Sequence, residues 1–275
     1  MKIAVVGHKG RLGSELINQG CIPFDCDITR TVQVQEAIKA TIPDVIINCA
    51  AITDVDSCEQ IGIYKKAVAI SKMGIMNLLQ LFNGRVIYIS TDYVFDGRNG
   101  AYSENSKPNP ISNYGLSKYL GEQVFLGYQI KRSDILIRTT ILYGGNKPDF
   151  VTKTLDQLKE GKQFTVPMNL FGTPTYIPHL AEALIKLSKM KDAPKIVHIA
   201  GEDVLSRYEF ALMIAGVFGY NKELILPAKW KWDMKSANRP KKAGLKTNLA
   251  KKIGLPIYTV LSGLQEMKNE PTNII

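Results

Sequence analysis

The sequence predicts an α/β protein: a Rossmann-like, doubly wound parallel sheet with a smaller α/β region towards the C-terminus. Short runs rich in Ile and Val alternate with amphipathic segments through the first half of the chain. Such alternation is typical of a parallel sheet with helices on both faces. Beyond residue 146 prolines separate the helical segments, as expected where short elements fold over the open edge of a larger sheet.

Each predicted strand is a short apolar run bounded by polar residues or glycine, and each predicted helix opens near a polar or turn residue. We expect strands at residues 2–6, 44–48, 85–90 and 134–138, and helices at 12–19, 31–40, 60–82 and 113–129, followed by helices at 151–160, 179–190, 207–218, 248–253 and 258–268. The larger domain would then comprise residues 1–145 with returning segments near 176–200, and the smaller region about 146–175 and 201–275.

The composition is that of an ordinary globular protein, with 45% hydrophobic and 22% charged residues. No apolar run reaches the roughly 20 residues of a membrane-spanning helix, and residues 1–6 resemble a strand rather than a secretory signal. We therefore expect a soluble, cytoplasmic protein with no membrane partner. The formal net charge is +10, but the lysines are scattered, so an anionic small molecule suits this charge at least as well as nucleic acid, and no nucleic-acid partner is expected.

The four cysteines are irregularly spaced and form neither a Cys-x-x-Cys pair nor the paired doublets of a zinc site. We expect Cys21, Cys26, Cys49 and Cys58 to be reduced, mostly buried thiols, and we name no metal ligand.

Three glycines, Gly7, Gly10 and Gly13, stand where the first strand turns into the first helix. A phosphate-binding turn needs glycine where the backbone turns tightly, approaches a pyrophosphate and packs on the strand, and the helix N-terminus then offers free N–H groups. The spacing differs from Gly-x-Gly-x-x-Gly, and an ordinary strand-to-helix turn is the alternative. The N-terminal position favours dinucleotide binding.

An acidic residue for the adenosine ribose should follow about 20 residues later. Asp25 and Asp27 both qualify, while Arg11 could meet a 2'-phosphate as readily. The choice between NAD and NADP therefore stays open.

Tyr114 and Lys118 are four residues apart, which places them on one face of a helix. A neighbouring ammonium would lower the pKa of the phenol, and the lysine could hold a nicotinamide ribose. The alternative is a partly exposed helix face with a lysine extended towards solvent. Thr91 follows the strand at 85–90, where its hydroxyl could bind a carbonyl oxygen and stabilise the alkoxide formed by hydride transfer; a turn or helix cap is the plainer role of Thr91 and Asp92.

Taken together, several segments resemble the dTDP-4-dehydrorhamnose reductases, a family of extended short-chain dehydrogenases/reductases. The resemblance covers nearly the whole chain, and its most specific part is Ser-Thr-Asp-Tyr-Val-Phe at 90–95. The other matching segments are the glycine turn at 7–13, Asp-Ile-Thr at 27–29, residues 43–53 with Val-Asp at 55–56, Tyr-Gly-Leu-Ser-Lys at 114–118 with Gly-Glu at 121–122, Arg-Thr at 138–139, Leu-Tyr-Gly at 142–144, Gly-Thr-Pro-Thr at 172–175 and Arg-Pro at 239–240.

The resemblance implies reduction of the C4 ketone of a nucleotide-linked 6-deoxy sugar, with NADPH or NADH in the larger domain and the nucleotide sugar in the smaller region. A homodimer is a candidate assembly. Thr91, Tyr114 and Lys118 would be catalytic. The cofactor pyrophosphate would contact Gly7, Gly10, Arg11 and Leu12, and its adenosine end would contact Asp27 and Ile28. The rest of the cofactor would contact Ala50, Ala51, Thr53, Tyr114 and Lys118. The substrate would contact Thr91, Asp92, Val55, Ile141, Phe150 and Arg239.

The sequence departs from the family pattern around the expected sugar. Ile141 stands where a Trp is common, Asn169 and Leu170 where Asp-Gln is usual, Ser71 where an Asn often stands, and Asp149 precedes Phe150 in place of Asn. These differences predict an altered substrate pocket beside an intact catalytic core.

Two other functions remain open. The same fold serves as a non-catalytic subunit that binds methionine adenosyltransferase, although retention of Thr91, Tyr114 and Lys118 argues against that role here. Within enzymes, a bifunctional epimerase and reductase of a UDP-linked 4-keto sugar is the closest rival.

Overall fold

A computed structural model of the protein describes residues 1–128, 133–231 and 236–270. Its centre is a six-stranded sheet, parallel throughout, in the order β10-β5-β4-β3-β1-β2. The chain runs outward from β1 in both directions, so the crevice at the carboxyl ends of β1 and β3 is the place where such sheets bind ligands. The strands are β1 (Ile3–Val6), β2 (Ile22–Phe24), β3 (Val45–Asn48), β4 (Arg85–Thr91), β5 (Ile135–Thr139) and β10 (Ile196–His198).

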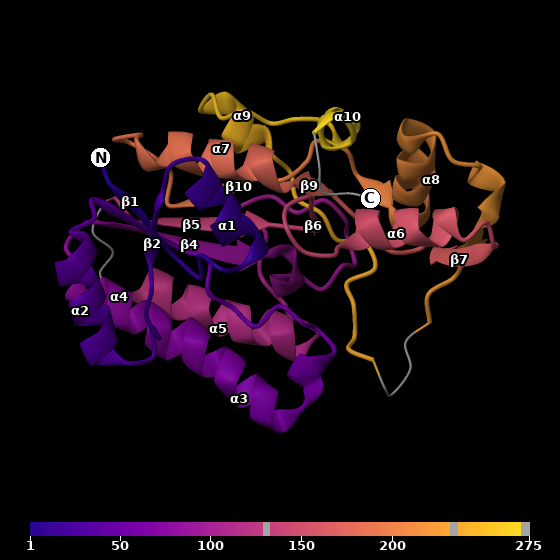
Figure 1. Ribbon diagram of the computed structural model, residues 1–275. Coiled ribbons are helices and arrows are strands. Elements are labelled where there is room, and N and C mark those ends of the chain that lie inside the picture. Colours follow the sequence, from indigo (N-terminus) through magenta and orange to yellow (C-terminus); the bar gives the residue numbers. More distant parts are fainter. Residues whose placement is uncertain (129–132, 232–235, 271–275) are drawn as a thin grey trace.

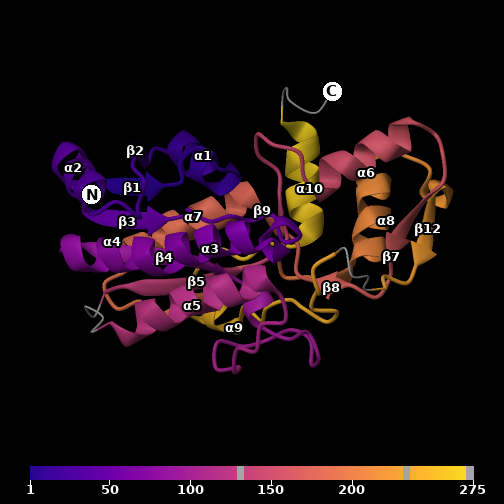
Figure 2. The ribbon, with the colours of Figure 1, turned by 90° about the horizontal axis from the view of Figure 1, so that it is seen from below.

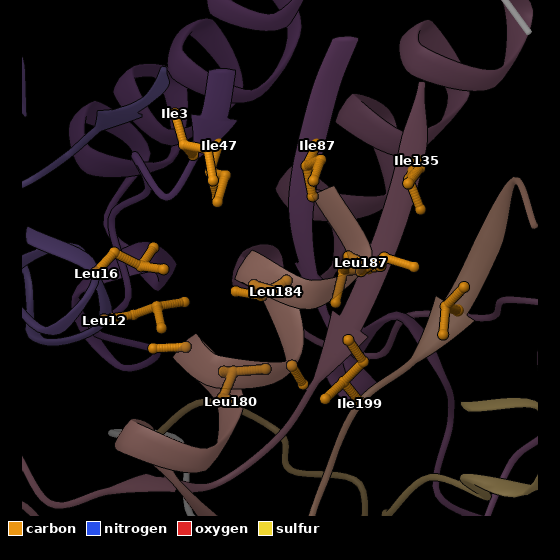
Figure 3. Close-up of a cluster of buried hydrophobic side chains, with 14 of the residues drawn as sticks. Ile3, Leu12, Leu16, Ile47, Ile87, Ile135, Leu180, Leu184, Leu187 and Ile199 are labelled. Atoms are coloured by element: carbon orange, nitrogen blue, oxygen red, sulfur yellow. The ribbon is translucent and has the colours of Figure 1, made fainter. Parts of the chain in front are cut away.

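Alternate residues of the strands point to opposite faces, and each face is covered by its own helices. Ile3, Val5 and Ile47 belong to one hydrophobic cluster, together with leucines of α1 (Arg11–Asn18) and α7 (Ile177–Ser188). Figure 3 shows these leucines reaching towards the isoleucines of the strands.

The opposite face of the sheet is formed by the residues between these, including Ala4, Val6 and Ile46. It is covered by α2 (Thr31–Thr41), α4 (Ile75–Leu81) and α5 (Asn113–Gly127). Figure 1 shows the resulting three layers, with α1 and α7 on one side of the sheet and α2, α4 and α5 on the other.

The predicted helix at 60–82 is one continuous helical path with an irregular centre. It consists of α3 (Ile61–Ala69), a π-helical turn η2 (Ile70–Gly74) and α4. The short 3-10 helix η1 (Ser57–Glu59) precedes it, and η2 packs against α5.

A smaller lobe lies beyond the carboxyl edge of the sheet, as Figure 2 shows from a second direction. Its core is formed by α6 (Phe150–Lys159), α8 (Arg207–Phe218) and α10 (Val260–Asn269). Short strand pairs complete it, and α9 (Asn248–Lys252) returns to pack near β10. The remaining elements are β6 (Leu142–Tyr143), β7 (Phe164–Pro167), β8 (Phe171–Gly172), β9 (Thr175–Tyr176), β11 (Leu205–Ser206), β12 (Ile225–Ala228) and the 3-10 helices η3 (Asp92–Val94) and η4 (Lys222–Leu224).

The α/β class and the parallel sheet predicted from the sequence are confirmed, and the four predicted strands agree with β1, β3, β4 and β5 to within one residue at each end. The predicted end of the fourth helix at residue 129 lies outside the described residues. All four cysteines are free thiols; Cys21 and Cys58 are buried, and Cys26 and Cys49 are partly buried. Within the described ranges, no helix is long and apolar enough to cross a membrane.

Candidate active site

A cavity of about 680 Å³ opens at the carboxyl edge of the sheet, between the main sheet and the smaller lobe. It brings together most of the residues that the sequence singled out. These are Gly7, Gly10, Arg11, Leu12, Ala51, Thr53, Val55, Thr91, Asp92, Tyr114, Lys118, Ile141, Phe150 and Arg239. Ala50, Asp27 and Ile28 are not part of its lining.

The turn after β1 has the geometry of a phosphate cradle. Gly7 has a φ of +73°, which favours glycine. A Cβ on Gly13 would lie 2.2 Å from the carbonyl oxygen of Gly7, so the turn and the first turn of α1 pack too closely for any side chain. The first turn of α1 holds no acidic residue, and its N–H groups are free to bind an anion. These residues fit the pyrophosphate of a dinucleotide.

At the expected adenosine end, the two candidate aspartates have different surroundings. Asp25 directly follows β2 and lies 3.6 Å from the Lys9 ammonium of the glycine turn. Asp27 instead accepts hydrogen bonds from the backbone N–H and the hydroxyl of Thr29, at 2.9 and 2.7 Å, which lower the pKa of its carboxyl. Ile28 is buried beneath this turn. Of the two carboxylates, Asp25 is thus the one that pairs with a residue of the glycine turn, and Asp27 is bonded within its own turn.

Close packing at the start of α5 brings Tyr114 to the end of β4. Ser112 caps the helix by accepting a hydrogen bond from the Gly115 N–H at 3.2 Å. A Cβ on Gly115 would lie 2.2 Å from the carbonyl oxygen of Tyr93, so only glycine lets the helix approach the segment after β4 this closely. Tyr114 thereby comes within hydrogen-bonding range of Thr91.

The Tyr114 phenol is held in its protonated form. Burial raises its pKa, and the hydrogen bond with Thr91 opposes the shift without cancelling it. The sequence led us to expect a pKa lowered by Lys118; in the protein alone the pKa is raised, because desolvation is the largest effect and Lys118 is not among the causes of the shift. A protonated phenol at this place can donate a proton.

Lys118 lies one helical turn further on and is almost completely buried. Its Nζ stands 4.3 Å from the centre of the Tyr88 ring. Burial lowers its pKa to about 8, while the charge of Glu122 raises it. Glu122 is itself held by Arg138, through bonds of 2.9 and 2.7 Å, and by the Ser90 hydroxyl at 2.5 Å. Lys118 thus keeps its ammonium free of a direct carboxylate partner within the described residues.

Thr91 and Asp92 both line the cavity, and Thr91 also has the plainer role of a cap. Thr91 caps η3 by accepting a hydrogen bond from the Tyr93 N–H at 3.3 Å, and it also lines the cavity. The buried Asp92 carboxylate accepts hydrogen bonds from the hydroxyls of Thr140 at 2.5 Å and Thr91 at 3.2 Å. Burial raises the pKa of Asp92 despite these bonds.

Two residues predicted to contact the substrate stand out, Ile141 for its backbone conformation and Arg239 for its ion pair. Ile141 has a φ of +41°, a conformation that is strained for a β-branched residue and that is typically kept at functional sites. Arg239 donates from Nη2 to Asp56 at 2.7 Å, so its charge is already paired.

The sequence did not single out Arg207, Lys153 or Tyr93, yet all three line the cavity. Arg207 occupies the first turn of α8, directly after its cap Ser206. The sequence could have drawn attention to this residue, because the first turn of a helix favours acidic residues and an arginine there is unusual.

The chain matches known proteins over nearly its whole length. Residues 1–272 match the model of the RmlD substrate binding domain. The dTDP-4-dehydrorhamnose reductase of Mycolicibacterium smegmatis is 30% identical over 284 aligned residues, which cover 96% of this chain and 84% of that protein. The spore coat polysaccharide biosynthesis protein SpsK of Bacillus subtilis is 31% identical over 78% of both chains. Methionine adenosyltransferase 2 subunit beta of Danio rerio is 28% identical over 93% of this chain and 86% of that protein.

Among solved structures, the dTDP-4-dehydrorhamnose reductase of Bacillus anthracis in complex with NADP superposes with a TM-score of 0.88 at 30% identity, covering 98% of this chain and 99% of that one. The UDP-glucose 4-epimerase of Thermus thermophilus, at 16% identity and a TM-score of 0.78 over 98% of this chain and all of that one, shares the fold. The family model spans the glycine turn, the cavity and the smaller lobe alike, so the chain belongs to the RmlD substrate binding domain family.

Proposed function

We propose that the chain reduces the C4 ketone of a nucleotide-linked 6-deoxy-4-keto sugar with NADPH or NADH, and that dTDP-4-dehydrorhamnose is the substrate. One observation carries this proposal: a single cavity is lined at one end by the phosphate cradle and further along by Thr91, Tyr114 and Lys118. The names of the relatives support the choice of sugar nucleotide.

The cradle residues would hold the cofactor pyrophosphate, with Gly10, Arg11 and Leu12 at the N-terminus of α1. Ala51 and Thr53 would contact its middle, since they follow β3 at the same edge of the sheet. Asp25 or Asp27 would meet the adenosine ribose. When bound, the reduced nicotinamide supplies the hydride.

The chain's own residues would handle the proton and the developing negative charge. Tyr114 is protonated and donates its proton to the carbonyl oxygen as that oxygen gains charge. Thr91 offers a second donor to the same oxygen. Lys118 would bind the nicotinamide ribose and, once protonated, favour the phenolate that Tyr114 becomes.

The smaller lobe would hold the sugar nucleotide. Phe150 opens α6 of this lobe, and Ile141 and Arg239 reach the cavity from segments next to it. Val55, Thr91 and Asp92 would bound the sugar from the side of the sheet.

Reduction without epimerisation fits the carboxylates of the cavity. Asp92 is bound by Thr140. Asp149 accepts hydrogen bonds from the N–H groups of Gly144 at 2.6 Å and Val151 at 2.8 Å, as the cap of α6. Both carboxylates are therefore engaged in structure, whereas an epimerase needs an additional free acid or base beside the sugar.

The likeness to the methionine adenosyltransferase subunit keeps a regulatory role as the second candidate. The two functions are separated by one assay. The purified chain is mixed with NADPH or NADH and dTDP-4-dehydrorhamnose, or with UDP- or GDP-linked 4-keto sugars, and cofactor oxidation is followed by absorbance. We expect oxidation with the dTDP sugar and a product reduced at C4. Absence of turnover with every 4-keto sugar nucleotide would favour the regulatory role.

A further inference from the structure

On the side of the smaller lobe, the cavity is lined by an arginine, Arg207, that has no ion-pair partner among the described residues. The guanidinium of Arg207 forms no hydrogen bond or salt bridge within residues 1–128, 133–231 and 236–270, although it lines the cavity. Arg239, the other arginine on this side, is paired with Asp56. The nearest carboxylate influence on Arg207 is that of Asp92, which is itself hydrogen-bonded to Thr140.

The position of Arg207 is unfavourable for a cation. It occupies the first turn of α8, where the positive end of the helix dipole repels positive charge. Burial lowers the pKa of its guanidinium, and the charge of Arg239 acts in the same direction. Burial, the helix dipole and Arg239 therefore all oppose the charge of Arg207 in the empty protein, and only Tyr93 and Asp92 favour it. The placement is explained if an anion bound in the cavity compensates the charge.

Arg207 is also held in place before any ligand arrives. Its guanidinium stacks over the Phe150 ring, with 4.8 Å from Cζ to the ring centre. Phe150 in turn stacks on Phe210, with ring centres 5.4 Å apart and an angle of 18° between the planes. The backbone N–H of Arg207 donates to Leu170 at 2.9 Å. A fixed, planar, two-donor group of this kind suits a phosphate oxygen pair.

We propose that Arg207 binds the diphosphate of the sugar nucleotide and thereby selects substrates with a diphosphate next to the sugar. The inference rests on the proposed function. Arg207 lies beside Asp92 and Tyr93, which directly follow the catalytic Thr91. In a 4-keto sugar nucleotide the phosphate is attached to C1, on the opposite side of the sugar ring from the C4 carbonyl. If Thr91 binds the C4 oxygen, the phosphate therefore lies about one sugar ring away from Thr91, and we place it at Arg207. The cofactor pyrophosphate has its own cradle at Gly7 to Gly13.

The test uses binding, so that it does not depend on turnover. The chain saturated with NADP is titrated calorimetrically with dTDP, UDP and GDP, and the comparison is between the parent chain, Arg207→Met and Arg207→Lys. Methionine keeps apolar contact with Phe150 but has no charge, whereas lysine keeps the charge without the two-donor geometry. Arg98→Met is the matched control, since the Arg98 side chain is 80% exposed and lies outside the cavity.

We expect Arg207→Met to weaken the best-bound nucleoside diphosphate about 10- to 100-fold, Arg207→Lys to weaken it less, and Arg98→Met to leave it unchanged. NADP affinity should be the same in all four proteins. The melting temperature of Arg207→Met should not fall, because the substitution removes a cation from a helix N-terminus. Equal diphosphate affinity in the parent chain and in Arg207→Met would overturn the inference.

A further comparison identifies which anion is bound. If Arg207 met a carboxylate on the sugar, Arg207→Met would weaken binding of UDP-glucuronic acid but leave UDP-glucose unchanged, which would also overturn the inference. If Arg207-dependent diphosphate binding is found but no 4-keto sugar is reduced, the inference stands and the proposed function falls.

Discussion

The Asp56 carboxylate accepts a hydrogen bond from Nη2 of Arg239 at 2.7 Å, across 183 positions of sequence. Its second oxygen accepts the backbone N–H of Ala237 at 2.8 Å. One aspartate from the loop after β3 therefore fastens the segment of the C-terminal half that carries Arg239. Val55, next to Asp56, lines the cavity together with Arg239, so this contact supports one wall of the cavity.

Replacing Asp56 with Ala should loosen that wall. We expect KM for the sugar nucleotide to rise about 3- to 10-fold, the equivalent of roughly 0.7–1.4 kcal/mol for a partly exposed ion pair, while the affinity for NADPH stays the same. Asp44→Ala is the control, because Asp44 bonds the backbone N–H of Lys2 and the N-terminal ammonium and does not line the cavity. Steady-state kinetics with each substrate varied gives the answer; an unchanged sugar KM would show that the pair does not shape the site.

The same pair has a defined dependence on pH. The hydrogen bond from Arg239 lowers the pKa of Asp56 below its ordinary value. A carboxyl with a lowered folded-state pKa stabilises the protein above its unfolded pKa, near 3.9, and that stability is lost as the pH falls through the folded pKa. Acid titration by NMR should show Asp56 protonating at a lower pH than an aspartate in an unstructured peptide, whose pKa is about 3.9.

The glycine turn gives a second prediction. Gly13→Ala should abolish NADPH binding and lower the melting temperature, because the new Cβ would lie 2.2 Å from the Gly7 carbonyl oxygen. Gly62→Ala, in the first turn of α3, meets nothing within 4 Å. It should leave cofactor affinity intact and raise stability by up to about 1 kcal/mol. Fluorescence titration with NADPH and thermal melts test both, and normal NADPH affinity in Gly13→Ala would refute the cradle.

The buried pair of Glu122 and Arg138 gives a third. Glu122→Ala leaves Arg138 buried without its partner, so unfolding in urea should show a loss of about 3–5 kcal/mol. The double replacement by Leu should lower the free energy of unfolding clearly less than the sum of the losses in Glu122→Leu and Arg138→Leu. Additive losses would mean that the two charges are not coupled.

Lys118 gives a fourth prediction, on stability. Its pKa is lowered from 10.5 to about 8 by burial, so between those values the unfolded chain binds a proton that the folded chain has lost. The stability of the parent protein without cofactor should therefore rise with pH across this window. Lys118→Met should be inactive yet more stable at pH 7 by about 1–3 kcal/mol, and the difference should shrink above pH 10. A less stable Lys118→Met at pH 7 would contradict the assigned burial cost.

The sequence predicted the part of the fold that depends on local pattern. The strands at 44–48 and 85–90 are continuous apolar runs because both faces of a parallel sheet are buried. For that reason they could be predicted from the sequence. The sixth strand β10 (Ile196–His198) was not predicted, because three residues carry little pattern and its place beside β5 depends on contacts distant in sequence. A strand was expected before Asp25 and Asp27, but the bounds of β2, which is also three residues long, were not predicted.

The candidate site was predicted where a motif has a local geometry. The glycine turn and the pair of Tyr114 and Lys118 were recognised from their spacing together with their places in the chain, and the structure places them in one cavity. The protonated state of Tyr114 and the free guanidinium of Arg207 depend on burial and on what neighbouring segments leave unpaired. Neither can be read without the fold.

The most direct test of the account is the rate of NADPH oxidation with dTDP-4-dehydrorhamnose by Tyr114→Phe, beside Tyr119→Phe from the same helix, whose ring lies outside the cavity. Loss of a positioned proton donor should lower kcat about 10²- to 10⁴-fold, with NADPH affinity and melting temperature close to those of the parent, while Tyr119→Phe turns over normally. If Tyr114→Phe oxidises NADPH as fast as the parent chain, Tyr114 is not the proton donor and the central claim is wrong.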